Sequence, residues 1–437
     1  MSADLVLKNG LVIVEGKPVV RSVAISSGKI DGIFIGNDVP SGKETIDCDG
    51  NYILPGAIDI HVHLRDLSRE DKEDFSTGTK AAAAGGVTTV LDMPNSQPPT
   101  LSWNALREKI SRARERRYVN IGFYGGIPFS IEDFDTEMVP HIHGLKVYPH
   151  SPLLAEVKFT SNRIRESMKL AKTHRIPLLF HPDVASTEDQ PVTHDEFFKR
   201  HSCENEVESI RNFIRIREQV DCRLHVCHVS CAKSAELIAA NRAESSLTAE
   251  VTPHHLLLQR DSFSHHNGVA KMLPPLRTKN DNNELWQYLQ RCAIDCVATD
   301  HAPHTWGEKS AKFKYAPSGI SGLETMVPIL LTEVFDGNLS WVEYLRYCCS
   351  GPARIMHLRE KGVLTKGYDA DIVVIEKGEW RIEGKDFYSK SKLTPFEGRI
   401  IKAKPIHTIV RGDVVYSHGN FPIGPGYAGH VPVASII

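Results

Sequence analysis

The sequence has no apolar run long enough to span a membrane, which would need about 20 residues. It also has no excess of charge of one sign, because the formal net charge is -2 over 437 residues. That balance argues against a surface built to bind nucleic acid. The first residues lack a basic segment followed by an apolar core, so no secretory signal is expected. Together these features predict a cytoplasmic protein that binds neither nucleic acid nor membrane.

Cysteine is scarce, with nine residues and no C-x-x-C pair in the chain. Those beside strand-like apolar runs are Cys222, Cys227, Cys231, Cys292 and Cys296. A free cysteine behaves as a small hydrophobic residue, so we expect buried, reduced thiols in a cytosolic enzyme. A structural zinc site made of these cysteines is the alternative.

What the chain does contain is an ordinary globular composition, with 41% hydrophobic and 24% charged residues. Its length predicts either one large α/β barrel with additions or two to three domains. Apolar strand candidates alternate with helical stretches from about residue 57 to 355. These candidates are 57–63, 87–92, 121–124, 144–148, 177–181, 223–228, 246–252 and 296–300. Eight parallel strands with intervening helices are typical of a (β/α)8 TIM barrel, a fold of the α/β class.

Both ends of the chain read as short strands separated by turns. The N-terminal turns are predicted at Lys8-Asn9-Gly10, Glu15-Gly16-Lys17 and Ser27-Gly28-Lys29. Turn residues between β-branched runs indicate hairpins. Strand patterns return near the C-terminus at 371–375 and 407–416. We therefore expect residues 1–55 and 360–437 to form one small β-sandwich beside a barrel domain at 56–359.

The first predicted barrel strand ends in Asp59-Ile60-His61-Val62-His63-Leu64-Arg65. Alternate side chains of a strand point to the same face, so His61 and His63 can bind one metal ion together. The pair alone is ambiguous, because the chain has 21 histidines and this spacing also arises by chance. A metal site therefore needs support from the later strands.

That support comes from the carboxyl ends of later predicted strands, where barrel enzymes keep their active sites. The residues there are Lys146, His181, His228 and Asp300. Each has a simpler explanation: a snorkelling lysine, core histidines, or a carboxylate that caps a helix. All of these would have to hold at once, whereas histidine and carboxylate ligands together suit Zn²⁺. A buried lysine fits such a site if CO₂ adds to its neutral amine, because the resulting carbamate can bridge two cations.

The chain resembles the amidohydrolase superfamily and, within it, the dihydroorotases, over nearly its whole length. The matching motifs are His61-Val62-His63-Leu64-Arg65, 77–89, Asp92-Met93-Pro94-Asn95, Gly144-Leu145-Lys146, 225–230, 250–256 and 298–304. Residues 351–355 and 367–371 match the superfamily in general and indicate the fold rather than the substrate.

This resemblance implies two Zn²⁺ ions per subunit, bridged by a carbamate on Lys146. One zinc would bind His61, His63, Asp300 and Lys146, and the other Lys146, His181 and His228. A hydroxide between the metals would be the nucleophile, with Asp300 as general base and then general acid. The implied reaction is the reversible cyclisation of N-carbamoyl-L-aspartate to (S)-dihydroorotate plus water, a step of de novo pyrimidine (UMP) biosynthesis.

The resemblance also implies that Arg65, Asn95 and His304 bind the substrate carboxylate, with Arg65 as a bidentate fork. The simpler explanations are a surface ion pair, a turn asparagine and a solvated loop histidine. Arg65 together with Met93-Pro94-Asn95 favours dihydroorotase over hydantoinases and allantoinases, whose substrates lack this carboxylate. A hydantoinase- or allantoinase-type cyclic amidase remains an alternative, as does a catalytically silent homologue.

Three places depart from the family pattern. Leu273 stands where many members have a polar residue that contacts the substrate, and Asp66-Leu67-Ser68 replaces a frequent Glu-Pro-Gly. Residues 149–154 lack the threonine pair of a mobile catalytic loop, so no lid chemistry is carried over. Besides the small-molecule substrate, the partner expectations are a homodimer and an association with aspartate transcarbamoylase.

Overall fold

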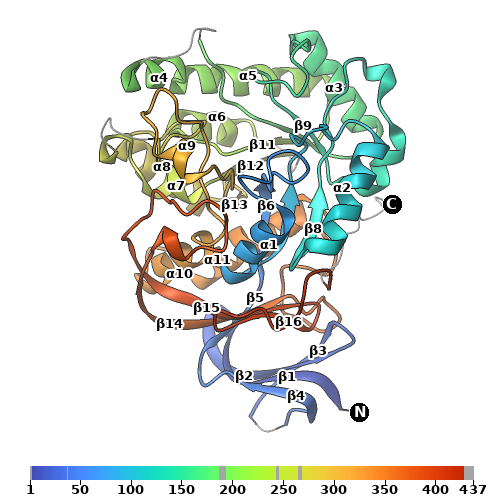
Figure 1. Ribbon diagram of the computed structural model, residues 1–437, viewed down its shortest axis with the longest axis vertical. Helices are drawn as coiled ribbons and strands as arrows, with labels where there is room; N and C mark the ends of the chain where they lie inside the picture. Colours follow the sequence, from blue (N-terminus) through green and yellow to red (C-terminus); the bar gives the residue numbers. More distant parts are fainter. Residues whose placement is uncertain (1, 37, 187–192, 243–245, 264–267, 428–437) are drawn as a thin grey trace.

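A computed structural model of the chain describes residues 2–36, 38–186, 193–242, 246–263 and 268–427. Figure 1 shows two parts, a barrel surrounded by helices above and a layered β-sheet below. No helix within these ranges has both the length and the apolar character needed to cross a membrane.

Eight parallel strands form the barrel, at the positions predicted from the sequence. They are β6 (Ala57–Val62), β7 (Val87–Asp92), β8 (Asn120–Phe123), β9 (Leu145–Val147), β10 (Leu178–Phe180), β11 (Leu224–Val226), β12 (Leu247–Val251) and β13 (Cys296–Val297). Hydrogen bonds join neighbouring strands in two sheets. One has the order β6-β7-β8, and the other has the order β13-β12-β11-β10-β9. Parallel bridges between Gly125 and Leu145 and between Val62 and His301 close the ring. The predicted TIM barrel is confirmed.

Helices cover the outside of the ring and connect the strands. They are α1 (Phe75–Ala84), α2 (Trp103–Arg116), α3 (Ser161–Thr173), α4 (His194–Arg200), α5 (Cys203–Val220), α6 (Ala232–Ala240), α7 (Pro253–Leu257), α8 (Lys279–Gln290), α9 (Trp306–Lys309), α10 (Met326–Phe335), α11 (Trp341–Leu345) and α12 (Gly351–Ile355). The described connection from β8 to β9 has two short 3₁₀ helices instead, at Ile131–Asp133 and Thr136–His141. Pro140 lies inside the second, and proline removes a helical hydrogen bond.

Burial of the strands explains why they read as continuous apolar runs. Every residue of β6 and β7 is buried, as expected for parallel strands covered on both faces. The polar exceptions are tied down: the Asp59 carboxylate accepts hydrogen bonds from the amides of His61 and Thr299, each at 3.1 Å. Asp59 thereby links the first strand, at His61, to the chain that follows the last one.

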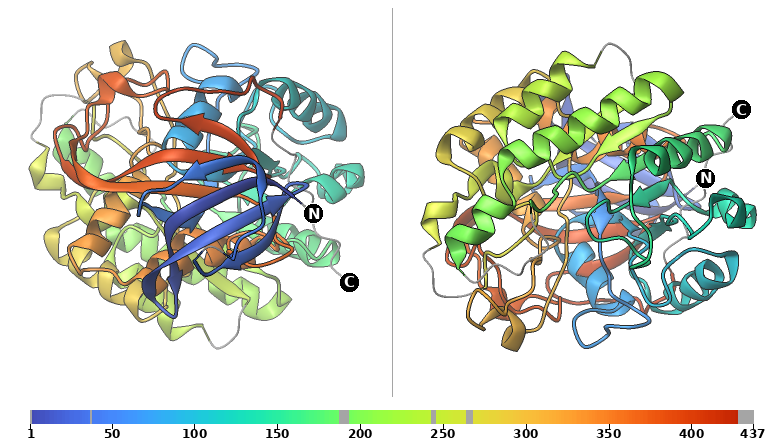
Figure 2. Two further views of the ribbon diagram at one scale, coloured as in Figure 1. Left: turned by 90° about the horizontal axis from the view of Figure 1, so that it is seen from below. Right: turned by 90° about the horizontal axis from the view of Figure 1, so that it is seen from above.

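Both ends of the chain build the second part, an eight-stranded sheet. Its strands are β1 (Ala3–Val14), β2 (Lys17–Ser26), β3 (Lys29–Phe34), β4 (Gly42–Asp47), β5 (Tyr52–Pro55), β14 (Ile372–Arg381), β15 (Ile400–Val410) and β16 (Asp413–Ser417). The order is β16-β15-β14-β5-β1-β2-β3, with β4 paired to β1. The sheet folds into two layers, and Figure 2 (left) shows the blue N-terminal strands beside the red C-terminal strands. Side chains from both ends share one core, for example Val12 and Ile53 with Ile372 and Val374.

This arrangement confirms the β-sandwich built from both ends, while the boundaries at 55 and 360 stay a prediction; residues 428–437 lie outside the described ranges. Two local expectations were wrong. The predicted turn at Lys8-Asn9-Gly10 lies inside β1, where Asn9 has φ 55° and the pairing with β2 shifts register. The predicted strand 407–416 is a hairpin, because Arg411 and Gly412 both adopt positive φ between β15 and β16.

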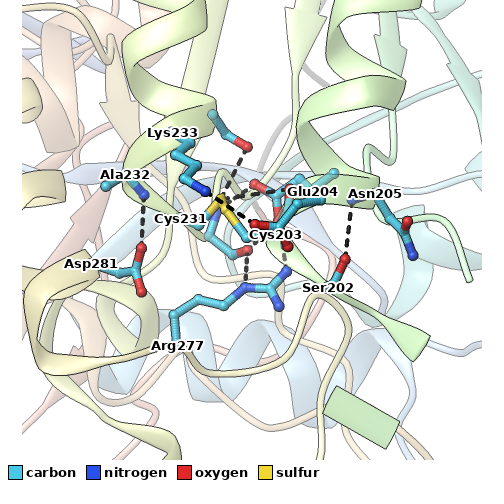
Figure 3. The surroundings of a disulfide bond; sticks show 12 residues. Ser202, Cys203, Glu204, Asn205, Cys231, Ala232, Lys233, Arg277 and Asp281 are labelled. Carbon is cyan, nitrogen blue, oxygen red and sulfur yellow. Dashed lines mark hydrogen bonds and ion pairs between the residues drawn. A yellow bond between two sulfur atoms is a disulfide. The ribbon is translucent and has the colours of Figure 1, made fainter. Parts of the chain in front are cut away.

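The cysteines also differ from expectation at one position. Cys231 forms a disulfide with Cys203, which begins α5, while Cys231 itself precedes α6 (Figure 3). The starts of the two helices lie side by side, with a Cα–Cα distance of 6.0 Å that suits a disulfide. The other four predicted thiols are free, three of them buried and Cys292 half-buried. Of the cysteines in the described part of the chain, only Cys227 belongs to a group able to hold a metal, and the other members of that group are His61 and Glu250. A zinc site made of cysteines is therefore not supported.

Candidate active site

A cavity of about 500 Å³ opens at the carboxyl ends of the barrel strands. Eight of the nine predicted site residues line it: His61, His63, Arg65, Asn95, His181, His228, Asp300 and His304. The ninth, Lys146, is 1% exposed within β9. The fold therefore brings together residues that are spread over about half of the chain.

His61 and His63 approach Asp300 through one nitrogen each, because the other nitrogen is held elsewhere. His61 Nδ1 is bonded to the buried Glu250 carboxylate, which leaves its Nε2 3.3 Å from Asp300 Oδ1. His63 Nδ1 donates to Asn95 Oδ1 at 2.8 Å, which leaves its Nε2 3.1 Å from the same oxygen. The three groups lie close enough together to hold one metal ion.

These separations fit a zinc ion. Ligands about 2.0–2.1 Å from a tetrahedral zinc lie about 3.4 Å apart, close to the two distances to Asp300. Although burial opposes it, His61 and His63 hold the pKa of Asp300 below its usual range, so Asp300 is a carboxylate at neutral pH. Burial lowers the pKa of His63 to about 4, so its ring is neutral. A neutral imidazole and a carboxylate are the forms that bind a metal.

His61 differs from His63 in its charge. Burial lowers its pKa, but the Glu250 carboxylate raises it by more, and the result is a pKa of about 10. A metal ion that binds His61 Nε2 would displace the proton on that nitrogen. The positive charge of the metal would then replace the charge of the ring in attracting Glu250. Glu250 also accepts a hydrogen bond from the amide of His228 at 3.2 Å, so one carboxylate orients both histidines.

A second pair lies beside the first. His181 Nδ1 is 2.8 Å from His228 Nε2, and the His228 ring centroid is 5.1 Å from that of His61. Burial first, then His181, His61 and Lys146, hold the pKa of His228 well below its usual range. The other nitrogen of His228, Nδ1, is buried without a hydrogen-bond partner among the described residues.

Lys146 connects the two groups. Its ammonium lowers the pKa of both His61 and His228, so its charge lies close to both. Its Nζ is 2.7 Å from Cys227 Sγ and 5.1 Å from the centre of the Tyr148 ring. A charged amine among these histidines has no carboxylate partner within ion-pair distance in the described chain, which is an unfavourable arrangement. The donor set thus fits a lysine that becomes anionic when the metals bind.

The opposite wall of the cavity is cationic. Arg65 has φ 60°, and its buried Nε has no partner among the described residues. His304 accepts a hydrogen bond from Lys72 Nζ at 2.8 Å and donates one to the carbonyl of Ser318 at 2.9 Å. Burial, Arg65 and Lys72 lower the pKa of His304 to about 3, so His304 is neutral. Lys72 is paired with Glu308 at 2.8 Å, so the positive charge of this wall comes from Arg65.

Sequence reasoning gave no role to Glu250 or Lys72. Glu250 was quoted within a motif, and its place inside the apolar strand β12 is a signal that could have marked it as a buried partner. Lys72 lies in an irregular loop after β6, and its partner His304 is 232 residues away. No pattern in the sequence joins those two residues.

Comparison with known proteins identifies the family that the sequence motifs resemble. Residues 52–415 match the Amidohydrolase family. A dihydroorotase from Listeria welshimeri is 36% identical over 428 residues, which cover 95% of this chain and 99% of that protein. A dihydroorotase from Methanosphaera stadtmanae is 33% identical over 428 residues, covering 94% and 96%. The chain belongs to the dihydroorotases of the amidohydrolase family.

Solved structures similar to this dihydroorotase-family chain include hydantoinases and dihydropyrimidinases. The L-hydantoinase from Arthrobacter aurescens aligns with a TM-score of 0.89 and 25% identity, covering 98% of this chain and all of that one. A dihydropyrimidinase from Brevibacillus agri aligns with a TM-score of 0.89 at 24% identity and supports the fold alone. The fold is thus shared with the hydantoinases, while the sequence groups with the dihydroorotases.

Proposed function

We propose that this chain catalyses the reversible cyclisation of N-carbamoyl-L-aspartate to (S)-dihydroorotate plus water. One observation carries the proposal: Arg65, whose buried Nε has no hydrogen-bond partner in the described part of the chain, lines the same cavity as His61, His63 and Asp300. A guanidinium there can bind a carboxylate of the substrate that takes no part in the reaction. Dihydroorotate has such a carboxylate beside the reacting amide, whereas hydantoin and allantoin do not.

Two Zn²⁺ ions are part of the proposal. The first would be held by His61, His63, Asp300 and Lys146, and the second by Lys146, His181 and His228. When bound, such metals make water acidic enough to attack at neutral pH and polarise the carbonyl of the substrate. The support is the donor set itself, which gathers imidazole and carboxylate groups at ligand distances around one buried lysine.

Lys146 is proposed to carry a carbamate. The ammonium would first give up one proton. The neutral Nζ would then attack the carbon of CO₂ and lose a second proton, so a cation becomes an anion with two oxygens. That change removes the repulsion between Lys146 and the surrounding histidines. It also supplies the negative charge that two divalent cations need between them.

Asp300 is proposed to move the proton. Its lowered pKa keeps it ready to accept a proton from the attacking water and to give it to the ring nitrogen as the amide bond breaks. In the direction of ring closure, Asp300 takes a proton from the carbamoyl nitrogen and gives it to the departing water. Meanwhile Arg65, with Asn95 and His304, would hold the carboxylate and so fix which amide faces Asp300.

The test is a comparison of turnover of dihydroorotate, hydantoin and allantoin by the metal-replete protein. We expect dihydroorotate to be hydrolysed with by far the highest kcat/KM, and activity to fall on chelation and return with Zn²⁺. Preference for hydantoin or allantoin would refute the substrate assignment. Absence of turnover of all three in protein that binds two metals would make it a silent homologue.

A cyclic amidase of the hydantoinase type is the second candidate. The observation in its favour is an apolar stretch of the cavity wall, formed by Pro152, Leu153, Leu154 and Leu273. That wall suits a ring without polar substituents. The homodimer, the association with aspartate transcarbamoylase and the cytoplasmic location stay predictions.

A further inference from the structure

A second cavity, of about 640 Å³, lies at the other end of the barrel. Arg223, Ser246 and Asp295 line it, and they directly precede β11, β12 and β13. His228 and Asp300 follow the carboxyl ends of β11 and β13. Because the strands are parallel, the second cavity and the active site are separated by the length of the barrel.

The lining of this cavity is strongly cationic. Five permanent cations take part, Lys172, Arg175, Arg223, Arg242 and Arg354, against the two carboxylates Asp221 and Asp295. The whole chain carries a formal net charge of -2, so this concentration of positive charge is local. A concave site with one sign of charge raises the local concentration of ligands of the opposite sign.

The two carboxylates neutralise only part of this positive charge. Asp295 is paired with Arg242 and accepts a hydrogen bond from the amide of Ala249 at 2.9 Å. Arg354 approaches Asp295 only to 3.7 Å, and 62% of its side chain is exposed. Arg242 is therefore satisfied within the protein, while Arg354 keeps most of its donors free.

Among these cations, Arg223 gives the strongest indication of a bound ligand. One end of its guanidinium donates to the carbonyl of Ile355. Its Nη1 is buried and has no hydrogen-bond partner among the described residues. A buried N–H without a partner destabilises the folded protein. A turn of the guanidinium toward an acceptor bound in the cavity would remove that penalty. Arg175, which is exposed, lines the same cavity and can contribute a second guanidinium.

Beside the cations the cavity has an apolar floor. Ala171, Ile176, Cys222 and Ile355 line it and are buried, each at most 4% exposed. Its volume lies in the range of sites for small molecules, about 300–1,000 Å³. Guanidinium groups bind phosphate oxygens in a bidentate manner, and an apolar floor accommodates a flat ring.

We propose that this cavity binds a small phosphate ester that carries an apolar or aromatic ring, such as a nucleoside phosphate. Arg175, Arg223 and Arg354 hold the phosphate groups, and the ring rests on Ile176 and Ile355. The site is a single concavity rather than an extended basic surface, which favours a small ligand over a nucleic acid. The inference is independent of the chemistry at the other end of the barrel.

The test is calorimetric titration of the metal-loaded protein with ADP. Dihydroorotate and carbamoyl aspartate are present in excess at equilibrium, so that Arg65 is occupied and ADP cannot bind there. We expect one ADP per chain, weaker binding of ribose 5-phosphate, and little binding of adenosine. Affinity for ADP should fall at least about tenfold in Arg223→Gln, which loses a charged donor.

Two further variants make the result decisive. Arg175→Gln changes an exposed side chain, so it tests the site even if Arg223→Gln folds poorly, and it should also weaken ADP about tenfold. Arg211→Gln removes an exposed arginine of α5 that pairs with Glu208, and it should bind ADP like the unaltered chain. The proposal fails if ADP does not bind, if neither arginine variant weakens it, or if adenosine binds equally well. Tighter binding of a single-stranded RNA through the same arginines would also overturn it.

Discussion

The two ends of the barrel differ in how their charged side chains are paired. At the carboxyl end, Glu250 and Asp300 each contact two histidines, and the charged groups converge on a centre. At the amino end, guanidinium groups outnumber carboxylates, and Arg223 keeps a buried donor that no described residue pairs with. The same strands β11 and β13 run between the two ends. Parallel strands therefore let one barrel carry two chemically independent sites, and substitutions at one end should leave the other unchanged.

The sharpest test of this separation is Lys146→Ala. Losing the residue proposed to join both metal positions should lower kcat/KM for dihydroorotate by on the order of 10³-fold, the several kcal/mol attributed to metal catalysis. Metal per chain, measured by plasma emission, should fall as well, while affinity for ADP stays the same. Arg175→Gln is the matched control at the amino end and should keep normal turnover. Normal activity of Lys146→Ala would refute the proposed metal bridge.

The next largest effect is expected for Arg65→Ala. Losing a charged hydrogen bond to the carboxylate costs about 1.5–3 kcal/mol, so KM for dihydroorotate should rise roughly 10- to 100-fold. Metal content should not change. Dihydrouracil, which has the same ring without the carboxylate, is the control substrate, and its turnover should be unaffected. If metal is lost instead, Arg65 has a structural role and the substrate assignment weakens.

Glu250→Gln tests how the carboxyl end orders its histidines. The substitution keeps the shape of the side chain but removes the charge that raises the pKa of His61. Partners of metal-binding histidines typically contribute 10- to 100-fold to affinity, so we expect zinc affinity to fall by about that factor. Competition with a chromogenic chelator measures it. Unchanged affinity would show that Glu250 only fills the core.

The smallest effect concerns the apolar wall. Leu273→Asn places a polar residue in the cavity, and one added hydrogen bond of about 1 kcal/mol would lower KM for dihydroorotate about fivefold. The ratio of dihydroorotate to hydantoin turnover should rise accordingly. Leu273→Met is the control, because it keeps the wall apolar. An unchanged ratio would mean that position 273 does not contact the ring.

The sequence predicts the carboxyl end of the barrel well, because the signal there is local. His61, His63, His181, His228 and Asp300 each lie at or just after a recognisable apolar strand, and parallel strands bring such ends together. The eight strands followed from the same pattern. A family resemblance then supplied Arg65 and the substrate, which strand patterns alone do not indicate.

The features that escaped prediction depend on contacts between distant segments. The Cys203–Cys231 disulfide requires the starts of α5 and α6 to lie side by side, and spacing in the sequence does not reveal that. The arginines of the amino-end cavity come from three separate loops and from α12, and they show no periodicity. The register shift at Asn9 depends on pairing with β2. Such features are set by tertiary packing rather than by local preference.

The barrel closes at a seam, where β6 meets the chain that follows β13, and this seam affects how the protein folds. His63 and Asp300 are 237 residues apart in sequence, and Asp59 and Thr299, which fasten the seam, are 240 apart. Contacts between such distant segments form only after long stretches of chain have been ordered. A growing chain on the ribosome therefore has no complete binding centre until Asp300 has left the exit tunnel and the ring has closed. Metal uptake at the proposed site should be a late step in folding, and a metal-sensitive signal would report the moment at which the barrel closes.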